Sequence, residues 1–224
     1  METFERVFQP DFEEVFRKDH YLKGNWAERV FKNNNPVVLE LGCGKGEYTI
    51  GLSQLHPEKN FIGVDIKGAR IWKGARNANE NNIQNVAFVR TRIEFIESFF
   101  GPDEVDEIWI TFPDPQLKKR RNKKRLTGSR FLNHYRQFLV DQGVVHLKTD
   151  NDIMYAYTRS IAEFNGLEIV NATGDLYHSK LADEVLSIRT YYEKQFLNEG
   201  SNINYISFRL PSGEEIKEFP DEKT

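Results

Sequence analysis

The chain has 224 residues, 39% of them hydrophobic, and a formal net charge of −3, which fits a globular protein with a real core and excludes general disorder. Its single cysteine, Cys43, excludes an internal disulfide and a cysteine-cluster metal site, and no apolar run reaches the ~20 residues that a membrane span needs. Because the first residues are also mixed and acidic, unlike a signal peptide, we expect a cytoplasmic protein without a metal or a membrane anchor.

Residues 1–35 are expected to form an N-terminal extension with two short amphipathic helices. Its apolar residues fall at helical spacings on either side of Pro10, at Phe4, Val7, Phe8, Phe12, Val15 and Phe16. This spacing favours packing of both helices on a core, and contact with a partner is left open. Three asparagines and Pro36 then break the pattern.

From residue 36 to residue 210, apolar runs and helical spacings alternate. The apolar runs predict seven strands, at 37–41, 61–64, 86–89, 107–111, 144–147, 167–170 and 205–210. The helical spacings predict helices at 48–55, 67–82, 93–100, 128–140 and 151–164. Such alternation indicates an α/β fold, with a mainly parallel seven-stranded sheet and helices on both faces. Residues 211–224 are expected to be a loose polar tail, and Trp72 and Trp109 to be core residues.

A glycine turn follows the first predicted strand and opens a helix. It contains three glycines, at Gly42, Gly44 and Gly46. Glycines let the backbone turn tightly and approach a ligand closely. Glu47 stands where a dinucleotide-binding fingerprint needs a further glycine, whereas Glu40 just before the turn and Asp65 after the second strand suit another ligand. A carboxylate at Asp65 can accept hydrogen bonds from both hydroxyls of a ribose. A turn without any ligand is the alternative interpretation.

An acid and a basic segment follow the fourth predicted strand. Asp114 stands between Pro113 and Pro115, which fix φ on both sides of it. In the next segment, Lys118 to Arg125, only Asn122 is uncharged and no residue is acidic. A charged run of this kind is often a solvated loop. Its position beside a rigidly held acid favours an anion-binding lip at a reaction centre.

The run Phe112-Pro113-Asp114-Pro115 and its basic segment closely resemble the bacterial tRNA (guanine-N7-)-methyltransferase family. The resemblance continues in E-x-G-x-G-x-G from Glu40, in a strand ending at Thr149-Asp150, and in the T-x-x-E element Thr190–Glu193. It covers about residues 36 to 210. It implies a Rossmann-like class I fold and transfer of a methyl group from S-adenosylmethionine (SAM) to N7 of a guanosine in the variable loop of tRNA.

The resemblance also implies roles for individual residues, with Asp114 as the catalytic one. The cofactor would be held by Glu40, Gly42, Gly44, Gly46, Asp65, Arg92 and Asp114. The tRNA would be bound by Lys118, Arg120, Arg121, Lys123, Lys124, Arg125, Asp150, Thr190, Tyr191, Tyr192 and Glu193. For Asp150, capping of the following helix is an equal alternative.

Three positions depart from the family pattern. Arg92 stands where the family has Asp or Asn to bind the adenine amino group, and a cation cannot accept that hydrogen bond. A backbone group or Glu94 is the alternative acceptor. Gln116 replaces the family's Trp, and Tyr191 replaces a usual Lys.

Guanine N7 carries an in-plane lone pair and no proton, so its methylation needs no strong base. Alignment of the two reactants and exclusion of water should dominate catalysis, with Asp114 holding a reactant or favouring the developing positive charge. Two other function classes compete with this hypothesis. One is a SAM methyltransferase that acts on another RNA, a protein or a small molecule, and the other is an RNA-binding protein without catalysis. A monomer and a homodimer are both left open.

Overall fold

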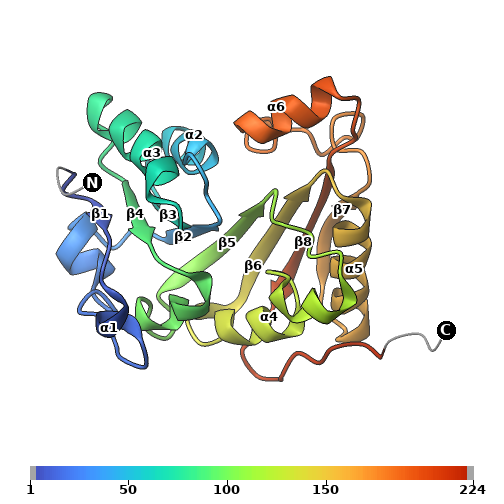
Figure 1. Cartoon of the computed structure of the whole chain (residues 1–224), viewed down its shortest axis with the longest axis horizontal. Helices are drawn as coiled ribbons and strands as arrows, with labels where there is room; N and C mark the ends of the chain where they lie inside the picture. The colour runs from blue at the N-terminus through green and yellow to red at the C-terminus, as the bar shows by residue number, and fades with distance from the viewer. Residues whose placement is uncertain (1–3, 221–224) are drawn as a thin grey trace.

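A computed structural model describes residues 4–220, with every side chain in that range except those of Lys119 and Arg120. Within this range one sheet contains eight strands in the order β1-β4-β3-β2-β5-β6-β8-β7 (Figure 1). The strands are β1 (Val7–Phe8), β2 (Val37–Leu41), β3 (Asn60–Asp65), β4 (Val86–Arg90), β5 (Val105–Thr111), β6 (Leu139–Thr149), β7 (Ile169–Thr173) and β8 (Asn204–Leu210). Strands β1 to β6 are parallel, and β8 lies antiparallel between β6 and β7.

Six α-helices accompany the sheet in the described range. They are α1 (Phe12–Val15), α2 (Glu47–Leu55), α3 (Gly68–Glu80), α4 (Ser129–Tyr135), α5 (Asp152–Phe164) and α6 (Tyr191–Asn198). A π-helical turn at Ala27–Phe31 and 3₁₀ turns at Ile93–Ser98 and Lys119–Lys124 complete the helical segments. Across residues 4–220, every helix is too short or too polar to cross a bilayer.

Two hydrophobic cores lie on opposite faces of the sheet, because neighbouring residues of a strand point to opposite sides. Val38, Phe61 and Trp109 pack in the core with α2 and α3. Their neighbours Leu39 and Ile62 pack in the core with α4 and α5. The predicted α/β architecture, with helices on both faces, is therefore confirmed, and β1 adds an eighth strand to the predicted seven.

The prediction that Val7 and Phe8 are helical is wrong, although α1 confirms a helix around Phe12. The two residues form β1 and pair with Phe88 and Val89 of β4. The open edge of β4 offers backbone hydrogen bonds that a helix of a few residues cannot match. Further along the segment Val15, Leu22, Trp26, Val30 and Phe31 are buried in the core, whereas Phe12, Phe16 and Tyr21 are exposed.

Two further sequence predictions need correction. The helix predicted at 128–140 ends at Tyr135, since Leu139 already pairs with Val105 as the start of β6. In α3, Ile71, Ala75 and Ala78 face inward, whereas Trp72 is exposed. The prediction that Trp72 is a core residue is therefore wrong, because the inward stripe of α3 leaves Ala69 and Trp72 exposed.

Residues 211–220 of the predicted tail are anchored to the protein by hydrogen bonds although most of them are exposed, and residues 221–224 lie outside the described part of the chain. Figure 1 shows residues 211–220 running past α4 and α5. Ile216 is buried and exchanges two hydrogen bonds with the Asn133 side chain, at 2.8 and 2.9 Å. These contacts join the segment to α4.

Candidate active site

The carboxyl ends of β2, β3, β4 and β5 meet at one edge of the sheet, as expected for parallel strands. A cavity of about 290 Å³ lies at this edge. Gly42, Arg92 and Gln116 line it from the turns after β2, β4 and β5, and Asp65 lines it from the last position of β3. The structure thus brings together residues that the sequence placed after four different strands.

The glycine turn needs its glycines for conformation and for space. Gly42, Gly44 and Gly46 have φ values of 78°, 56° and 71°, in the left-handed region that other residues avoid. A Cβ on Gly46 would lie 2.7 Å from the Phe88 ring. Asp65 supports the turn, because its carboxylate accepts hydrogen bonds from Gly44 N at 3.0 Å and Lys67 N at 2.7 Å. Each oxygen of Asp65 keeps a lone pair for a ligand.

Glu40 is buried behind the turn and is engaged by protein donors. Its carboxylate accepts hydrogen bonds from Thr49 N at 2.8 Å, from the Thr49 hydroxyl and from the Thr111 hydroxyl at 2.7 Å. Burial raises the pKa of Glu40 to about 7, although these hydrogen bonds act in the opposite direction. Glu40 therefore ties α2 and β5 to β2, and its predicted contact with a cofactor stays a prediction.

Asp114 lies exposed at the rim of the site on a strained turn. Phe112 and Gln116, on either side of it, have φ values of 50° and 48°. Such values cost about 1–3 kcal/mol each in residues other than glycine, and they persist only where neighbours hold the backbone. Two hydrogen bonds do so here, from Phe112 N to Lys148 O at 2.8 Å and from Gln116 N to Asp114 Oδ1 at 2.9 Å.

The basic segment divides into exposed and buried cations. Lys118, Arg121, Lys123 and Lys124 are exposed, and Lys124 also lines the cavity. The side chain of Arg120 lies outside the described part of the chain. Arg125 differs from the others, because its side chain is only 5% exposed. This burial gives no support to the predicted position of Arg125 along RNA phosphates, which stays a prediction.

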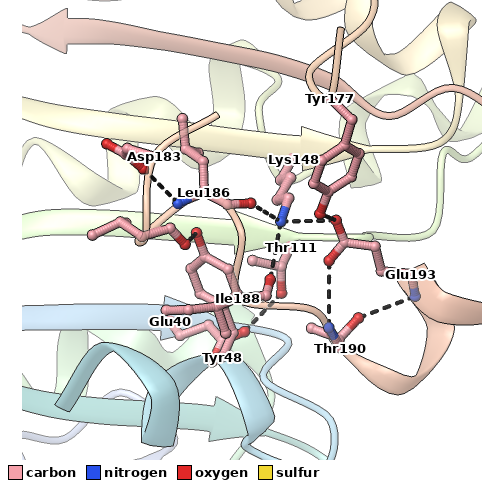
Figure 2. Close-up of polar contacts among 11 residues, drawn as sticks. Glu40, Tyr48, Thr111, Lys148, Tyr177, Asp183, Leu186, Ile188, Thr190 and Glu193 are labelled. Carbon is pink, nitrogen blue, oxygen red and sulfur yellow. Dashed lines mark hydrogen bonds and ion pairs between the residues drawn. The ribbon is translucent and has the colours of Figure 1, made fainter. Parts of the chain in front are cut away.

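Lys148, on β6, lies at the centre of a buried polar network beside the site. Figure 2 shows its ammonium group pointing at three acceptors. They are Leu186 O at 2.6 Å, Ile188 O at 3.0 Å and Glu193 Oε1 at 2.8 Å. Three acceptors match the three donors of a charged lysine. Burial lowers the pKa of Lys148, and the charge of Glu193 counteracts this.

Thr190 and Glu193 belong to this network and not to an exposed surface. Thr190 caps α6, because its hydroxyl accepts from Glu193 N at 3.2 Å while Glu193 Oε2 accepts from Thr190 N at 3.3 Å. Glu193 also accepts from the Tyr177 hydroxyl at 2.6 Å and is fully buried. Both residues thus position α6, and their predicted contacts with tRNA stay predictions.

The N-terminus of α6 lies against the glycine turn, beyond the arrowhead ends of β5 and β6 (Figure 1). Tyr191 donates its backbone N–H to Glu47 at 2.8 Å, and its exposed ring lies 3.2 Å from Lys45 Nζ. The Tyr192 hydroxyl accepts from Arg70 at 2.8 Å. Tyr191 therefore contacts the glycine turn and the start of α2, whereas Tyr192 contacts α3, and the predicted contacts of both tyrosines with tRNA stay predictions.

Asp150 follows β6 at the same edge and is half-buried, which raises its pKa. The alternative role as the cap of α5 is wrong. Asn151 is the N-cap, and its side chain accepts from Met154 N at 2.9 Å. The predicted contact of Asp150 with the substrate stays a prediction. Arg92 forms an ion pair with Glu94 at 3.2 Å, and both residues line the cavity.

Lys148, Thr49 and Thr111 hold the site together but were not predicted from the sequence. A signal was present for Lys148, since a lysine within an apolar run predicts a buried cation that needs a partner. The two threonines carried no local signal, because their bonds to Glu40 connect different elements of the fold.

Comparison with known proteins agrees with this geometry. A family model described as "Putative methyltransferase" matches residues 34–206. A protein of Bacteroides fragilis (strain YCH46) named "tRNA (guanine-N(7)-)-methyltransferase" is 51% identical over 221 residues, which cover 99% of this chain and 86% of the relative. A protein of the same name from Porphyromonas gingivalis (strain ATCC BAA-308 / W83) is 52% identical over 213 residues, covering 94% and 86%.

Solved structures share the fold at low sequence identity. The 16S rRNA methyltransferase KamB superposes with a TM-score of 0.64 and 11% identity, covering 82% of this chain and 92% of KamB. A structure described as an antibiotic-related methyltransferase gives 0.59 and 16%, covering 80% and 89%. With the residue pattern at the sheet edge, the family match and the long alignments, we conclude that the chain belongs to the methyltransferase family that includes these bacterial tRNA (guanine-N(7)-)-methyltransferases.

Proposed function

We propose that this protein transfers the methyl group of SAM to N7 of a guanosine in the variable loop of tRNA. The observation that carries the proposal is the position of Asp114. Asp114 is exposed two residues before Gln116, which lines the cavity, and four residues before Lys118, the first of the exposed cations, of which Lys124 also lines the cavity. Relatives named as tRNA (guanine-N(7)-)-methyltransferases support the same activity at about half identity over almost the whole chain.

The chemistry of the cavity fits SAM. The free lone pairs of Asp65 suit the ribose hydroxyls, and the backbone of the glycine turn suits close approach of the cofactor. Arg92 and Glu94 line the part of the cavity after β4, where the family resemblance places the adenine. When bound, SAM supplies a methyl group on a positively charged sulfur.

Substrate binding divides between charge and local contacts. Lys118, Arg121, Lys123 and Lys124 are exposed in one segment, which suits the closely spaced phosphates of RNA. Phosphate contacts fix the register of the RNA but do not choose the base. We assign choice of the base to the side chains at the sheet edge, Asp114 and Asp150 among them. A tRNA substrate also fits the predicted cytoplasmic location.

Catalysis then rests on alignment. N7 of guanine attacks through its own lone pair, so the protein's task is to hold N7 in line with the methyl group and to exclude water. The purine becomes cationic as the methyl group arrives. The carboxylate of Asp114, held by its strained turn, favours this charge in the transition state. No side chain is required to remove a proton.

The test is incubation of the protein with radiolabelled SAM and unmodified tRNA, followed by mapping of the label. We expect label at N7 of one guanosine in the variable loop. Label at another atom, in protein extract or in small molecules would contradict the proposal in favour of another methyltransferase. Calorimetry that detects tRNA binding but no SAM binding would instead indicate an RNA-binding protein without catalysis. Sedimentation of the same preparation distinguishes a monomer from a homodimer.

A further inference from the structure

The active-site turn and the basic segment form one loop whose two ends touch. Arg125 Nε, at the end of the segment, donates a hydrogen bond to the carbonyl of Pro115 at 3.0 Å. The residues between them carry the exposed cations Lys118, Arg121, Lys123 and Lys124, so this hydrogen bond joins the two ends of the exposed stretch. Pro115 directly follows Asp114, so this bond acts on the backbone next to the proposed catalytic residue.

The Arg125 side chain is buried beside an aromatic ring and near a carboxylate. Its guanidinium lies 4.2 Å from the centre of the Tyr157 ring on α5, a distance typical of a cation–π contact. The Tyr157 hydroxyl donates to Glu218 Oε1 at 2.7 Å, and the Ser129 hydroxyl donates to Glu218 Oε2 at 2.8 Å. The anchored C-terminal segment thus brings a carboxylate to the cluster that holds this buried cation.

Packing around Arg125 is tight. Gly128 donates its N–H to Arg125 O at 3.0 Å. A Cβ on Gly128 would lie 2.9 Å from the Tyr157 hydroxyl and 3.2 Å from Arg125 O. Arg125 itself is only 5% exposed, which separates it from the exposed Lys123 and Lys124, whose side chains are free to follow a ligand.

The turn that carries Asp114 needs such a support. Gln116 has a φ of 48°, a conformation that residues other than glycine keep only when the surroundings hold it. Its N–H orients the Asp114 carboxylate through a 2.9 Å hydrogen bond. Since Pro115 lies between the two, a shift of the Pro115 carbonyl would move both partners of that bond.

We propose that Arg125 is a positioning residue, which holds the Asp114 turn in its reactive orientation and does not contact the phosphates of tRNA. The predicted effect of Arg125 on the rate of methyl transfer rests on the proposed function, whereas its predicted support of the Asp114 turn does not. Arg125 acts through the backbone of Pro115, and its removal impairs the chemical step rather than the binding of tRNA.

The main test is the variant Arg125→Lys. It keeps the charge but lacks the planar fork that donates to Pro115 while lying over Tyr157. We expect kcat at saturating tRNA to fall at least tenfold, with the KM for tRNA and its salt dependence unchanged. Lys123→Ala should instead raise the KM and reduce the slope of log K against log salt by about 0.7–0.9. The same substitution on the surface of α5, Arg159→Lys, is the matched control and should stay within twofold of the parent protein.

Hydrogen exchange tests the structural part without tRNA. Amides of the Asp114 turn, that of Gln116 above all, should exchange at least tenfold faster in Arg125→Lys than in the parent protein. If the parent protein fails to methylate tRNA, the proposed function is wrong, and the exchange result still decides whether Arg125 holds the turn. Unchanged exchange, or an unchanged kcat with a reduced salt slope, would overturn the proposal.

A second variant covers the case in which Arg125→Lys does not fold. Tyr157→Phe keeps the ring beneath the guanidinium and removes the hydroxyl that binds Glu218. We expect about threefold lower kcat, faster exchange at the Asp114 turn and an unchanged salt slope. If the Tyr157→Phe protein has the same kcat and the same amide exchange rates as the parent, Arg125 and its surroundings do not hold the Asp114 turn.

Discussion

Replacing Glu193 by glutamine should lower the free energy of unfolding strongly, although the two side chains have the same size. Glutamine has the same shape as glutamate, and it supports a capping box equally well, so the start of α6 should be retained. What disappears is the negative charge 2.8 Å from Lys148 Nζ. Both side chains are fully buried, so water cannot replace that charge.

The expected loss follows from this burial. Removing one partner of a buried ion pair costs about 3–5 kcal/mol, because the other charge stays buried without compensation. For a chain of this length, about 1 kcal/mol corresponds to about 2–4 °C in melting temperature. Glu193→Gln should therefore lower the free energy of unfolding by about 3–5 kcal/mol and the melting temperature by about 6–20 °C.

Urea unfolding followed by circular dichroism at pH 7 measures this difference. The exposed pair Arg159–Glu163 provides the matched control, and Glu163→Gln should change the free energy by less than about 0.5 kcal/mol. The double variant Lys148→Met with Glu193→Gln should recover more than half of the loss, because it buries no unpaired charge. A loss below about 1 kcal/mol for Glu193→Gln would refute the role of Lys148 as a buried, charged clamp.

Three other changes test the site. Asp114→Ala should lower the rate of methyl transfer at least about 100-fold in initial-rate assays. Because Asp114 is exposed, the melting temperature of the variant should stay close to that of the parent protein. A rate within tenfold of the parent's would contradict the catalytic role of Asp114. Lys123→Ala with Lys124→Ala should weaken tRNA binding and flatten its salt slope by about 1.4–1.8 in titrations at several salt concentrations, and an unchanged slope would exclude phosphate contacts. Glu40 has a pKa raised from 4.5 to about 7, so its contribution to stability is full below pH 4.5 and is lost as the pH rises through 7. Relative to Glu40→Gln, the parent protein should lose about 3 kcal/mol in unfolding experiments between pH 4.5 and 8, and parallel pH profiles would disprove the shift.

Local patterns predicted the framework of the site. The glycine turn, Asp65 and Asp114 each follow an apolar strand, and parallel strands bring their carboxyl ends to one edge of a sheet. These three features could therefore be placed together from the sequence, and the structure finds Gly42 and Asp65 in one cavity wall, with Asp114 on the adjoining turn. The strands β2 to β6 were predicted for the same reason, since buried parallel strands are continuous apolar runs.

Predictions failed where a residue's role depends on a distant partner. Val7 and Phe8 carry a helical spacing, but the free edge of β4 makes them a strand. The T-x-x-E element was expected to face the tRNA, yet Lys148 draws Glu193 into the interior. Local sequence patterns do not predict such pairings, because the partners are far apart in the chain and come into contact only after folding.

The basic segment shows, for individual residues, the same difference between what local sequence predicts and what tertiary contacts determine. The sequence by itself determined that cations gather beside a rigid acid at the end of the fourth predicted strand. Only the tertiary structure decided which of them face solvent, because α5 places Tyr157 beneath Arg125 and leaves Lys123 and Lys124 outside. The sequence determines which residues are charged, whereas the burial of each charge depends on the folded structure. Burial in turn determines whether a cation is free to bind a ligand or instead stabilises the protein.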